Sequence, residues 1–187
     1  MSNRFKLIET PMAGLKLLGR LVMGDERGSL SRLYDAEDML EMGWSGGIAQ
    51  INHTLTRQAG TVRGMHYQNA PFAEAKLVTC LAGRILDVAV DIREGSPTFL
   101  RHFATELSEA NHRSLMIGPG FAHGFQALCD NAVLIYAHSA PYRADAEGGF
   151  NPADPRLAIH WPLPMIHLSA RDQAHPAIEP EFRGVET

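Results

Sequence analysis

The sequence predicts an all-β protein, a sandwich or a barrel, and three observations support this fold class. Apolar side chains recur with period two, as between Leu86 and Ile92, which is the alternation of a β-strand. Glycine and proline separate these stretches, for example at Gly83 and at Pro119. The stretches are also short and follow one another closely, which is typical of sandwiches and barrels.

In chain order, the pattern predicts one short helix at residues 35–42 and then a series of strands. We expect one domain of residues 1–187, with a barrel core at about 45–145 and a proline-rich, irregular arm at 150–187 that wraps over the strands. The strands are expected at residues 60–66, 76–81, 84–92, 102–107, 121–127 and 132–138.

Length and charge limit the possible functions. The 187 residues suffice for one domain with a proper core. A formal net charge of −4 gives no general attraction to nucleic acid or to an anionic membrane, so neither is an expected partner. Because no apolar run has the length of a signal peptide or a membrane span, we expect a cytoplasmic protein.

Three ionisable side chains stand out in the predicted strands. His66 and His123 alternate with apolar neighbours, so both rings are expected to point towards the interior. Lys76 lies in the apolar sequence AKLV. Burying its ammonium group is costly unless an anion meets it, and a ligand is one candidate for that anion.

Several common chemistries lack their motifs. The chain has no His-x-His pair, and its two cysteines lie far apart, so we expect no metal site. It also has no G-x-S-x-G elbow, no P-loop and no G-x-G-x-x-G sequence. Nothing in these patterns requires a cofactor.

Six segments occur in a characteristic order: RGMHYQ at 63–68, PFAEAKLV at 71–78, DVAVDIREGSPTF at 87–99, GFAHGF at 120–125, LAIHWPL at 157–163 and LSARD at 168–172. Together they resemble the dTDP-4-dehydrorhamnose 3,5-epimerase family over about residues 24–176. The resemblance implies a jelly-roll barrel of cupin type, a homodimer, that acts on a nucleotide-linked 4-keto-6-deoxyhexose without a cofactor.

The resemblance also implies catalytic roles. A ketone at C4 acidifies the C–H bonds at C3 and C5, so inversion needs a base, an acid on the opposite face and a cation near the enolate oxygen. By resemblance, His66 is the base and Asp172 the carboxylate that orients it. Tyr136 is the acid, while Lys76 and His123 support the developing oxyanion.

Arg63 resembles the arginine that binds the diphosphate. Strict alternation places Arg63 and His66 on opposite faces of one strand. Either Gly64 therefore marks a β-bulge, or Arg63 acts at a rim or on the ligand of another subunit. The other implied contacts are the aromatic Tyr142 beside the substrate and the polar residues Gln50, Asn52, Glu147 and Arg171.

The nucleotide end departs from the family pattern. The family usually has D-x-R-G-x-F-x-E where residues 25–32 read DERGSLSR. Arg27 is kept as an expected nucleotide contact, but Leu30 replaces the aromatic and Arg32 replaces the glutamate. Glu74 replaces a glutamine. Our hypothesis is that the proton chemistry is retained, while Arg32 changes the preferred base or the exact sugar.

Three alternatives remain open at this point. The first is an epimerase that inverts only C3 or only C5, on a different nucleotide sugar. The second is a non-catalytic cupin that binds sugar nucleotides, although such a protein is expected to have lost His66, Tyr136 or Asp172, and all three are present. The third is a metal-dependent cupin oxygenase, which elemental analysis would reveal.

Overall fold

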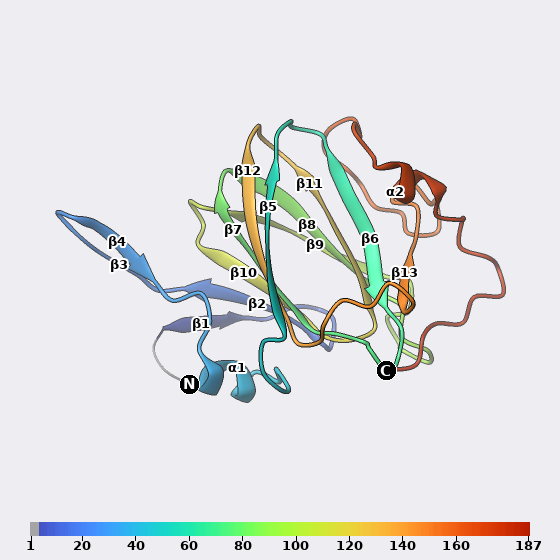
Figure 1. Ribbon diagram of the computed structural model, residues 1–187, viewed down its shortest axis with the longest axis horizontal. Coiled ribbons are helices and arrows are strands. Elements are labelled where there is room, and N and C mark those ends of the chain that lie inside the picture. Colours follow the sequence, from blue (N-terminus) through green and yellow to red (C-terminus); the bar gives the residue numbers. More distant parts are fainter. Residues whose placement is uncertain (1–3) are drawn as a thin grey trace.

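Two antiparallel β-sheets pack face to face in the computed structural model, which describes residues 4–187 (Figure 1). The six-stranded sheet has the order β1 (Phe5–Ile8), β2 (Leu15–Arg20), β10 (Arg113–Ile117), β7 (Lys76–Ala82), β12 (Ala132–His138) and β5 (Gln50–Thr56). The five-stranded sheet has the order β13 (Glu147–Gly149), β6 (Val62–Gln68), β11 (Phe121–Ala127), β8 (Arg84–Asp91) and β9 (His102–Ser108). The all-β prediction is therefore confirmed.

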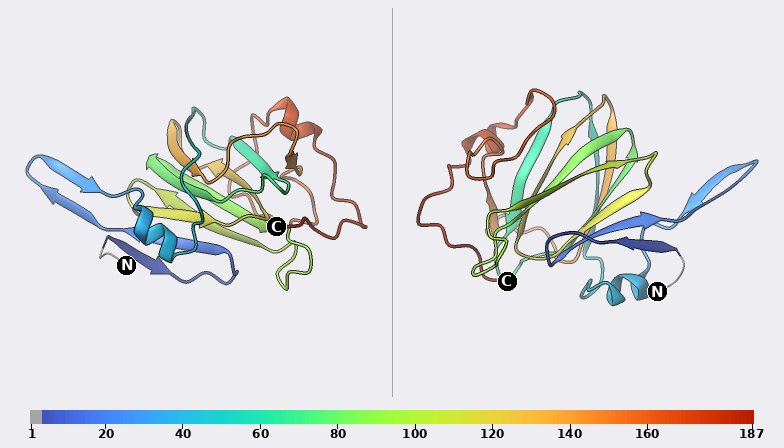
Figure 2. Two further views of the ribbon diagram at one scale, coloured as in Figure 1. Left: turned by 60° about the horizontal axis from the view of Figure 1, so that its bottom comes forward. Right: turned by 180° about the vertical axis from the view of Figure 1, so that it is seen from behind.

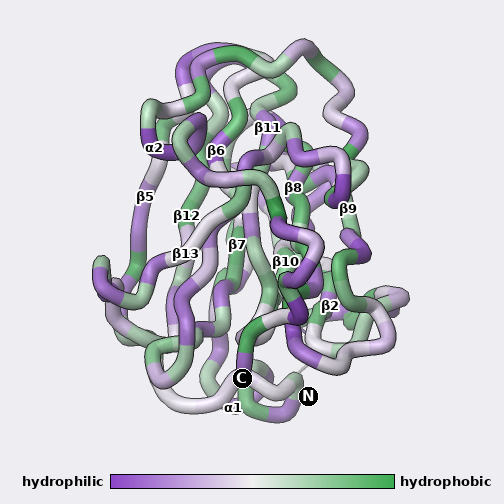
Figure 3. Tube along the Cα trace, turned by 90° about the vertical axis from the view of Figure 1, so that its right-hand side faces the viewer, coloured by the Kyte–Doolittle hydropathy of each residue, from purple (hydrophilic) through white to green (hydrophobic). Residues whose placement is uncertain are grey.

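The main core lies between the sheets, and the C-terminal arm makes a second one. Ile85 and Ala89 of β8 belong to the central cluster, together with residues of β7, β10 and β12. Val88 and Val90, on the other face of the same strand, pack under Phe150 and other residues of the arm. Figure 3 shows the hydrophobic stretches of β7 and β8 inside the molecule. The arm thus covers the strands, as the proline-rich sequence predicts.

Strands β1 and β2, which the sequence pattern does not predict, join the six-stranded sheet ahead of the predicted core at 45–145, and β5 and β10 of the same sheet were not predicted either. In β2, Leu17 and Leu18 are adjacent and both buried, so period two is lost. The reason is helix α1 (Ala36–Glu41), whose Met39 packs with Leu18 on the outer face of the sheet. The helix itself, capped by the side chain of Asp35, lies where the sequence predicts it.

A hairpin of β3 (Val22–Asp25) and β4 (Gly28–Ser31) projects from the body of the molecule, at the opposite end from the C-terminal arm (Figure 2). Its facing residues Met23 and Leu30 are 42% and 63% exposed. Within residues 4–187, no helix has the length and apolar character needed to span a membrane.

A β-bulge in β6 answers the question posed by Arg63 and His66. His66 pairs with His123 and Arg63 with Phe125, so two residues of β6 face a single residue of β11. Gly64 lies in the bulge with φ of 131°, and a Cβ added there would lie 2.5 Å from the Cα atom of Gly124. Because of the bulge, the side chains of Arg63 and His66 line the same cavity.

Candidate active site

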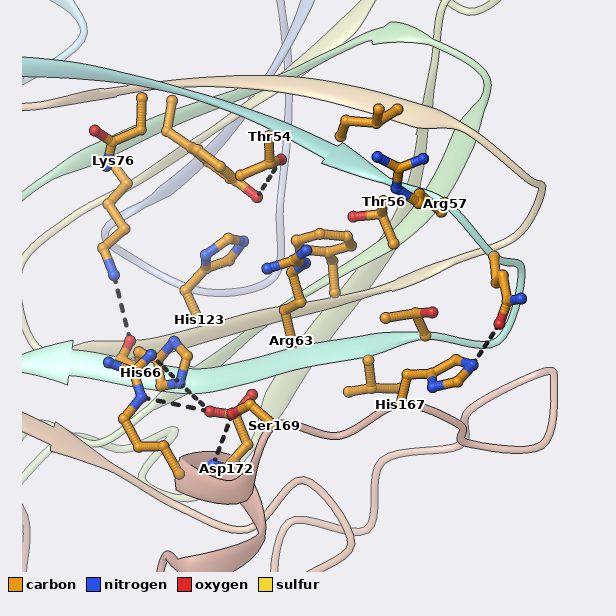
Figure 4. A pocket seen from close by; sticks show the side chains of 18 of the residues that line it. Thr54, Thr56, Arg57, Arg63, His66, Lys76, His123, His167, Ser169 and Asp172 are labelled. Carbon is orange, nitrogen blue, oxygen red and sulfur yellow. Dashed lines mark hydrogen bonds and ion pairs between the residues drawn. The ribbon is translucent and has the colours of Figure 1, made fainter.

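A cavity of about 940 Å³ lies between the two sheets, and the C-terminal arm forms part of its wall. His66 from β6, Lys76 from β7 and Tyr136 from β12 all line it, so residues from distant parts of the sequence meet around one space. Figure 4 shows His66 and Lys76 in this cavity. His123 of β11 and Asp172 of the arm line the same cavity.

Helix α2 (Ala170–Ala174) of the arm brings Asp172 to His66. Ser169 caps this helix, and its hydroxyl accepts a hydrogen bond of 3.0 Å from the Asp172 backbone N–H. One carboxylate oxygen of Asp172 lies 2.8 Å from Nε2 of His66, and the Asp172 side chain is 4% exposed. Because an ionised carboxylate only accepts, Nε2 carries the proton and the lone pair of Nδ1 remains available.

The surroundings favour a neutral His66. Burial lowers the pKa of this imidazole below its ordinary value, and the positive charges of Arg171 and Lys76 act in the same direction. The Asp172 carboxylate raises the pKa but does not outweigh them. Arg171 Nη2 lies 3.2 Å from His66 Nε2, where it acts as a nearby positive charge, since both groups are donors. The ring is therefore ready to accept a proton at neutral pH.

Tyr136 has the opposite character. Burial raises the pKa of its phenol far above the ordinary value, although a hydrogen bond with Thr54 acts against this. The two hydroxyl oxygens lie 3.5 Å apart. The Tyr136 ring also meets the His123 ring edge to face, with centroids 6.2 Å apart. A phenol of this kind remains protonated at neutral pH and can donate its proton.

Asp87, which the sequence analysis does not single out, orients His123. Its carboxylate lies 2.7 Å from His123 Nε2 and its side chain is fully buried. It shares its strand face with Ile85 and Ala89, both of which belong to the central core. An acidic residue on the core face of a predicted strand is the signal that could have identified it.

Lys76 meets its anion within the chain. Its Nζ atom lies 3.3 Å from Glu74 Oε1 and donates to the His66 backbone carbonyl, also at 3.3 Å. The other oxygen of Glu74 lies 2.9 Å from His138 Nδ1. His138 also lines the cavity but was not predicted as a site residue. The buried ammonium therefore needs no ligand to offset its charge.

A second cavity of about 420 Å³ adjoins the first and shares Asn52 and Arg171 with it. Glu147 accepts hydrogen bonds from Arg171 at 2.9 Å and from the Tyr142 hydroxyl at 2.9 Å. The predicted polar and aromatic contacts gather here, namely Gln50, Asn52, Tyr142, Glu147 and Arg171.

Two predicted nucleotide contacts lie elsewhere in the single chain. Arg27, in the turn of the β3–β4 hairpin, forms an ion pair of 2.6 Å with Asp25. Arg32 forms an ion pair of 2.6 Å with Asp35. Neither arginine lines the two cavities described above. Within one chain, both arginines therefore lie outside the cavity that His66 and Tyr136 line.

One group of side chains has the spacing that a metal ion would require. His66, Asp172 and His175 each place a ligand atom within 4.8 Å of the others. The Arg171 guanidinium lies 3.2 Å from His66 Nε2, so a cation bound there would meet a positive charge. The donor set is present, but the neighbouring guanidinium disfavours a bound cation.

The two-sheet fold, the paired histidine and aspartate, and a protonated tyrosine across the cavity fit a jelly-roll isomerase of the cupin class. The family model described as dTDP-4-dehydrorhamnose 3,5-epimerase matches residues 9–180. The chain belongs to this family, as the resemblance of its sequence segments predicted.

Individual relatives agree with this assignment. The chain is 43% identical to a dTDP-4-dehydrorhamnose 3,5-epimerase of Streptomyces griseus, over 86% of this chain and 81% of the relative. It is 39% identical to a dTDP-4-dehydrorhamnose 3-epimerase of Streptomyces niveus, over 80% of this chain and 72% of that one. Its structure matches the dTDP-6-deoxy-D-glucose-3,5-epimerase of Legionella pneumophila, solved in complex with dTDP-4-keto-L-rhamnose, with a TM-score of 0.91 and 36% identity over 98% and 99% of the chains. The predicted cupin jelly roll and the isomerase class are confirmed.

Proposed function

We propose that this chain inverts C3 and C5 of dTDP-4-dehydro-6-deoxyglucose, giving dTDP-4-dehydrorhamnose, by proton transfer through an enolate. The observation that supports this proposal best is the shared cavity of His66 and Tyr136. One is a base held by a buried carboxylate, and the other is a phenol that stays protonated. The side chains can supply a base, an acid and a cation, so the reaction needs no cofactor.

In this mechanism, Nδ1 of His66 removes the proton from C3 or C5, and the electron pair of the broken C–H bond moves to the C4 oxygen. Lys76 and His123 stabilise the resulting enolate, each by about 2–4 kcal/mol, the typical value for an oxyanion donor. Tyr136 then delivers its proton to the opposite face of the same carbon. The electron pair returns from oxygen, the ketone re-forms and the centre is inverted.

The direct test is proton NMR of dTDP-4-dehydro-6-deoxyglucose incubated with the enzyme in heavy water. We expect deuterium at both C3 and C5. Deuterium at one position alone would instead favour a single-site epimerase, the activity named for the Streptomyces niveus relative. No exchange above background with any nucleotide sugar would favour a binding module. Elemental analysis of the same sample tests for the metal that an oxygenase requires.

Replacing Asp172 with asparagine is expected to lower kcat by about 10²–10⁴-fold, because the amide neither fixes the Nε2–H tautomer nor stabilises the imidazolium. Asp172 raises the pKa of His66, so its loss lowers that pKa further. The acid limb of the pH–rate profile should therefore move to lower pH. A limb that moves to higher pH would contradict the proposed pairing.

The nucleotide base can be tested by calorimetry with dTDP, UDP, CDP and GDP. We expect dTDP to bind about tenfold more tightly than the others, because the relatives and the solved structure compared above are named for dTDP sugars. A clear preference for another base would support the hypothesis that Arg32 alters base recognition. The variant Arg32→Glu would then be expected to restore dTDP binding.

We also propose that the protein is a homodimer in which the β3–β4 hairpin packs against a second copy. Leu21, Met23 and Leu30 of this region are exposed, and the hairpin projects away from its own sheets (Figure 1). An isolated apolar hairpin of this kind gains stability by burial against a partner. Such packing could also carry Arg27 and Arg32 to the cavity of the second copy.

Replacing Leu30 with aspartate is expected to convert the dimer to a monomer, as measured by light scattering after gel filtration, because the new charge would be buried at the interface. Leu40, on α1, is 67% exposed and serves as the matched control. The variant Leu40→Asp should keep the mass of the wild type. A monomeric wild type, or a dimeric Leu30→Asp variant, would contradict this interface.

We further propose that residues 1–187 act as one domain and that the enzyme works in the cytoplasm. Its proposed substrate carries a diphosphate and cannot cross a membrane unaided, so substrate and enzyme must share a compartment. Fractionation of cells that express the protein, followed by the exchange assay, tests this location.

A further inference from the structure

Four hydrogen bonds and ion pairs form a continuous chain along one side of the cavity. Asn52 Nδ2 lies 3.3 Å from His138 Nε2, and His138 Nδ1 lies 2.9 Å from Glu74 Oε2. Glu74 Oε1 lies 3.3 Å from Lys76 Nζ, which also donates to the backbone carbonyl of His66. The side chains of Glu74 and His138 are 7% and 11% exposed, so water competes little for these contacts.

The charge of Glu74 dictates the direction of the first two hydrogen bonds. Burial raises the pKa of Glu74, but the hydrogen bond from His138 and the positive charge of Lys76 outweigh burial, and the net pKa is below the ordinary value. The ionised carboxylate can only accept, so His138 Nδ1 must carry a proton. In a neutral imidazole, Nε2 is then an acceptor, and only the amide N–H of Asn52 can satisfy it.

This arrangement leaves the amide oxygen of Asn52 for a ligand. Asn52 lines both cavities, and its side chain makes no other hydrogen bond to the residues between 4 and 187. The oxygen is an acceptor, so it pairs with a hydroxyl group and repels a phosphate oxygen.

We infer that Glu74 determines specificity by setting the polarity of Asn52: through His138, it makes Asn52 present an acceptor that binds a hydroxyl group of the nucleotide sugar. The inference rests on the proposed function and adds to it the kind of group that Asn52 recognises. Glu74 touches no substrate atom in this account, so it is a positioning residue.

The variant Glu74→Gln offers a sharp test, because glutamine has the same shape as glutamate and can reverse the donor and acceptor roles along this series of hydrogen bonds. Its oxygen can still accept from Lys76, but its NH₂ group would donate to His138 Nδ1. His138 would then carry its proton on Nε2, and Asn52 would turn its oxygen towards that proton and its NH₂ group towards the ligand. Residue 74 keeps its hydrogen bonds, while Asn52 presents a donor to the ligand in place of an acceptor.

The first measurement is ¹⁵N NMR of the imidazoles at pH 8, with the His138 signals assigned by their loss in His138→Gln. We expect the Nδ1–H tautomer in the wild type and the Nε2–H tautomer in Glu74→Gln. The second measurement is calorimetry with dTDP-L-rhamnose. We expect about tenfold weaker binding to Glu74→Gln, the effect of one mismatched hydrogen bond.

The sign of the second effect separates polarity from charge. Glu74→Gln removes one negative charge from a cavity proposed to bind an anion, so charge alone would strengthen binding. The control Glu106→Gln makes the same charge change on β9, where Glu106 pairs with Arg84 at 3.9 Å, and should leave the affinity unchanged. Calorimetry with dTDP then shows which sugar carries the hydroxyl. If it belongs to the deoxyribose, both dTDP and dTDP-L-rhamnose should bind Glu74→Gln more weakly. If it belongs to the hexose, only dTDP-L-rhamnose should bind more weakly.

Unchanged or tighter binding of dTDP-L-rhamnose by Glu74→Gln would overturn the inference. An Nε2–H or doubly protonated His138 in the wild type would overturn it as well. Neither measurement depends on turnover. Failure of the exchange assay in the wild type would therefore count against the proposed reaction, while these two measurements still decide the polarity of Asn52.

Discussion

Replacing His66 with alanine is expected to abolish deuterium exchange at both C3 and C5. Three other titratable side chains that line the cavity are engaged or protonated: His123 is bound to Asp87, His138 is bound to Glu74, and Tyr136 stays protonated. Loss of a positioned general base typically costs about 10²–10⁴-fold in rate. The measurement is the initial rate of deuterium incorporation from heavy water, followed by proton NMR.

The loss should be one of chemistry and not of folding or binding. The affinity for dTDP, measured by calorimetry, is expected to stay within about threefold of the wild type, the effect of at most one weak contact. His160 is exposed and does not line either cavity, so His160→Ala serves as a control with wild-type exchange. If His66→Ala still exchanged at the wild-type rate, the base would have to be another group.

Replacing Tyr136 with phenylalanine is expected to separate exchange from inversion. His66 can still remove a proton and return deuterium to the same face, so incorporation continues. Delivery to the opposite face loses its acid, and formation of the epimer should slow by about 10²–10⁴-fold. The ratio of inverted product to deuterated starting material, both visible by NMR, reports this separation.

The phenylalanine variant keeps the ring and loses only the hydroxyl, which contacts Thr54. Tyr34, which packs edge to face against Trp44 outside the cavity, provides the matched control Tyr34→Phe. That control should form the epimer at the wild-type rate. Full epimer formation by Tyr136→Phe would mean that water or another residue is the acid.

The sequence predicted those features that depend on one strand or one segment at a time. Period two identified β8, and the inward direction of His66 and His123 followed from their apolar neighbours. The approach of Asp172 to His66 was implied by family resemblance alone, because 106 residues separate the two. Alternation alone left two explanations for how Arg63 could act beside His66, a β-bulge or a role at a rim or on another subunit. The pairing register shows the bulge at Gly64.

Partners on neighbouring strands of one sheet could not be predicted, because they depend on strand order, register and packing. No sequence motif marks Asp87, and its role becomes clear only in the structure, where its carboxylate lies 2.7 Å from Nε2 of His123 on β11. Likewise, Glu74 lies in a loop, and its contact with His138 requires β7 and β12 to be neighbours. Arg27 matched a family motif in sequence and Arg32 departed from it, but the hairpin carries Arg27 away from the cavities of its own chain.

The most direct test of the account is a crystal structure of this protein with dTDP-L-rhamnose, which lacks the reactive ketone. The account predicts the hexose ring between His66 and Tyr136, with Nδ1 of His66 and the Tyr136 hydroxyl about 3–3.5 Å from opposite faces. It also predicts the C4 oxygen on the side of Lys76 and His123. A hexose outside this cavity, or both side chains on one face of the ring, would contradict the proposed mechanism.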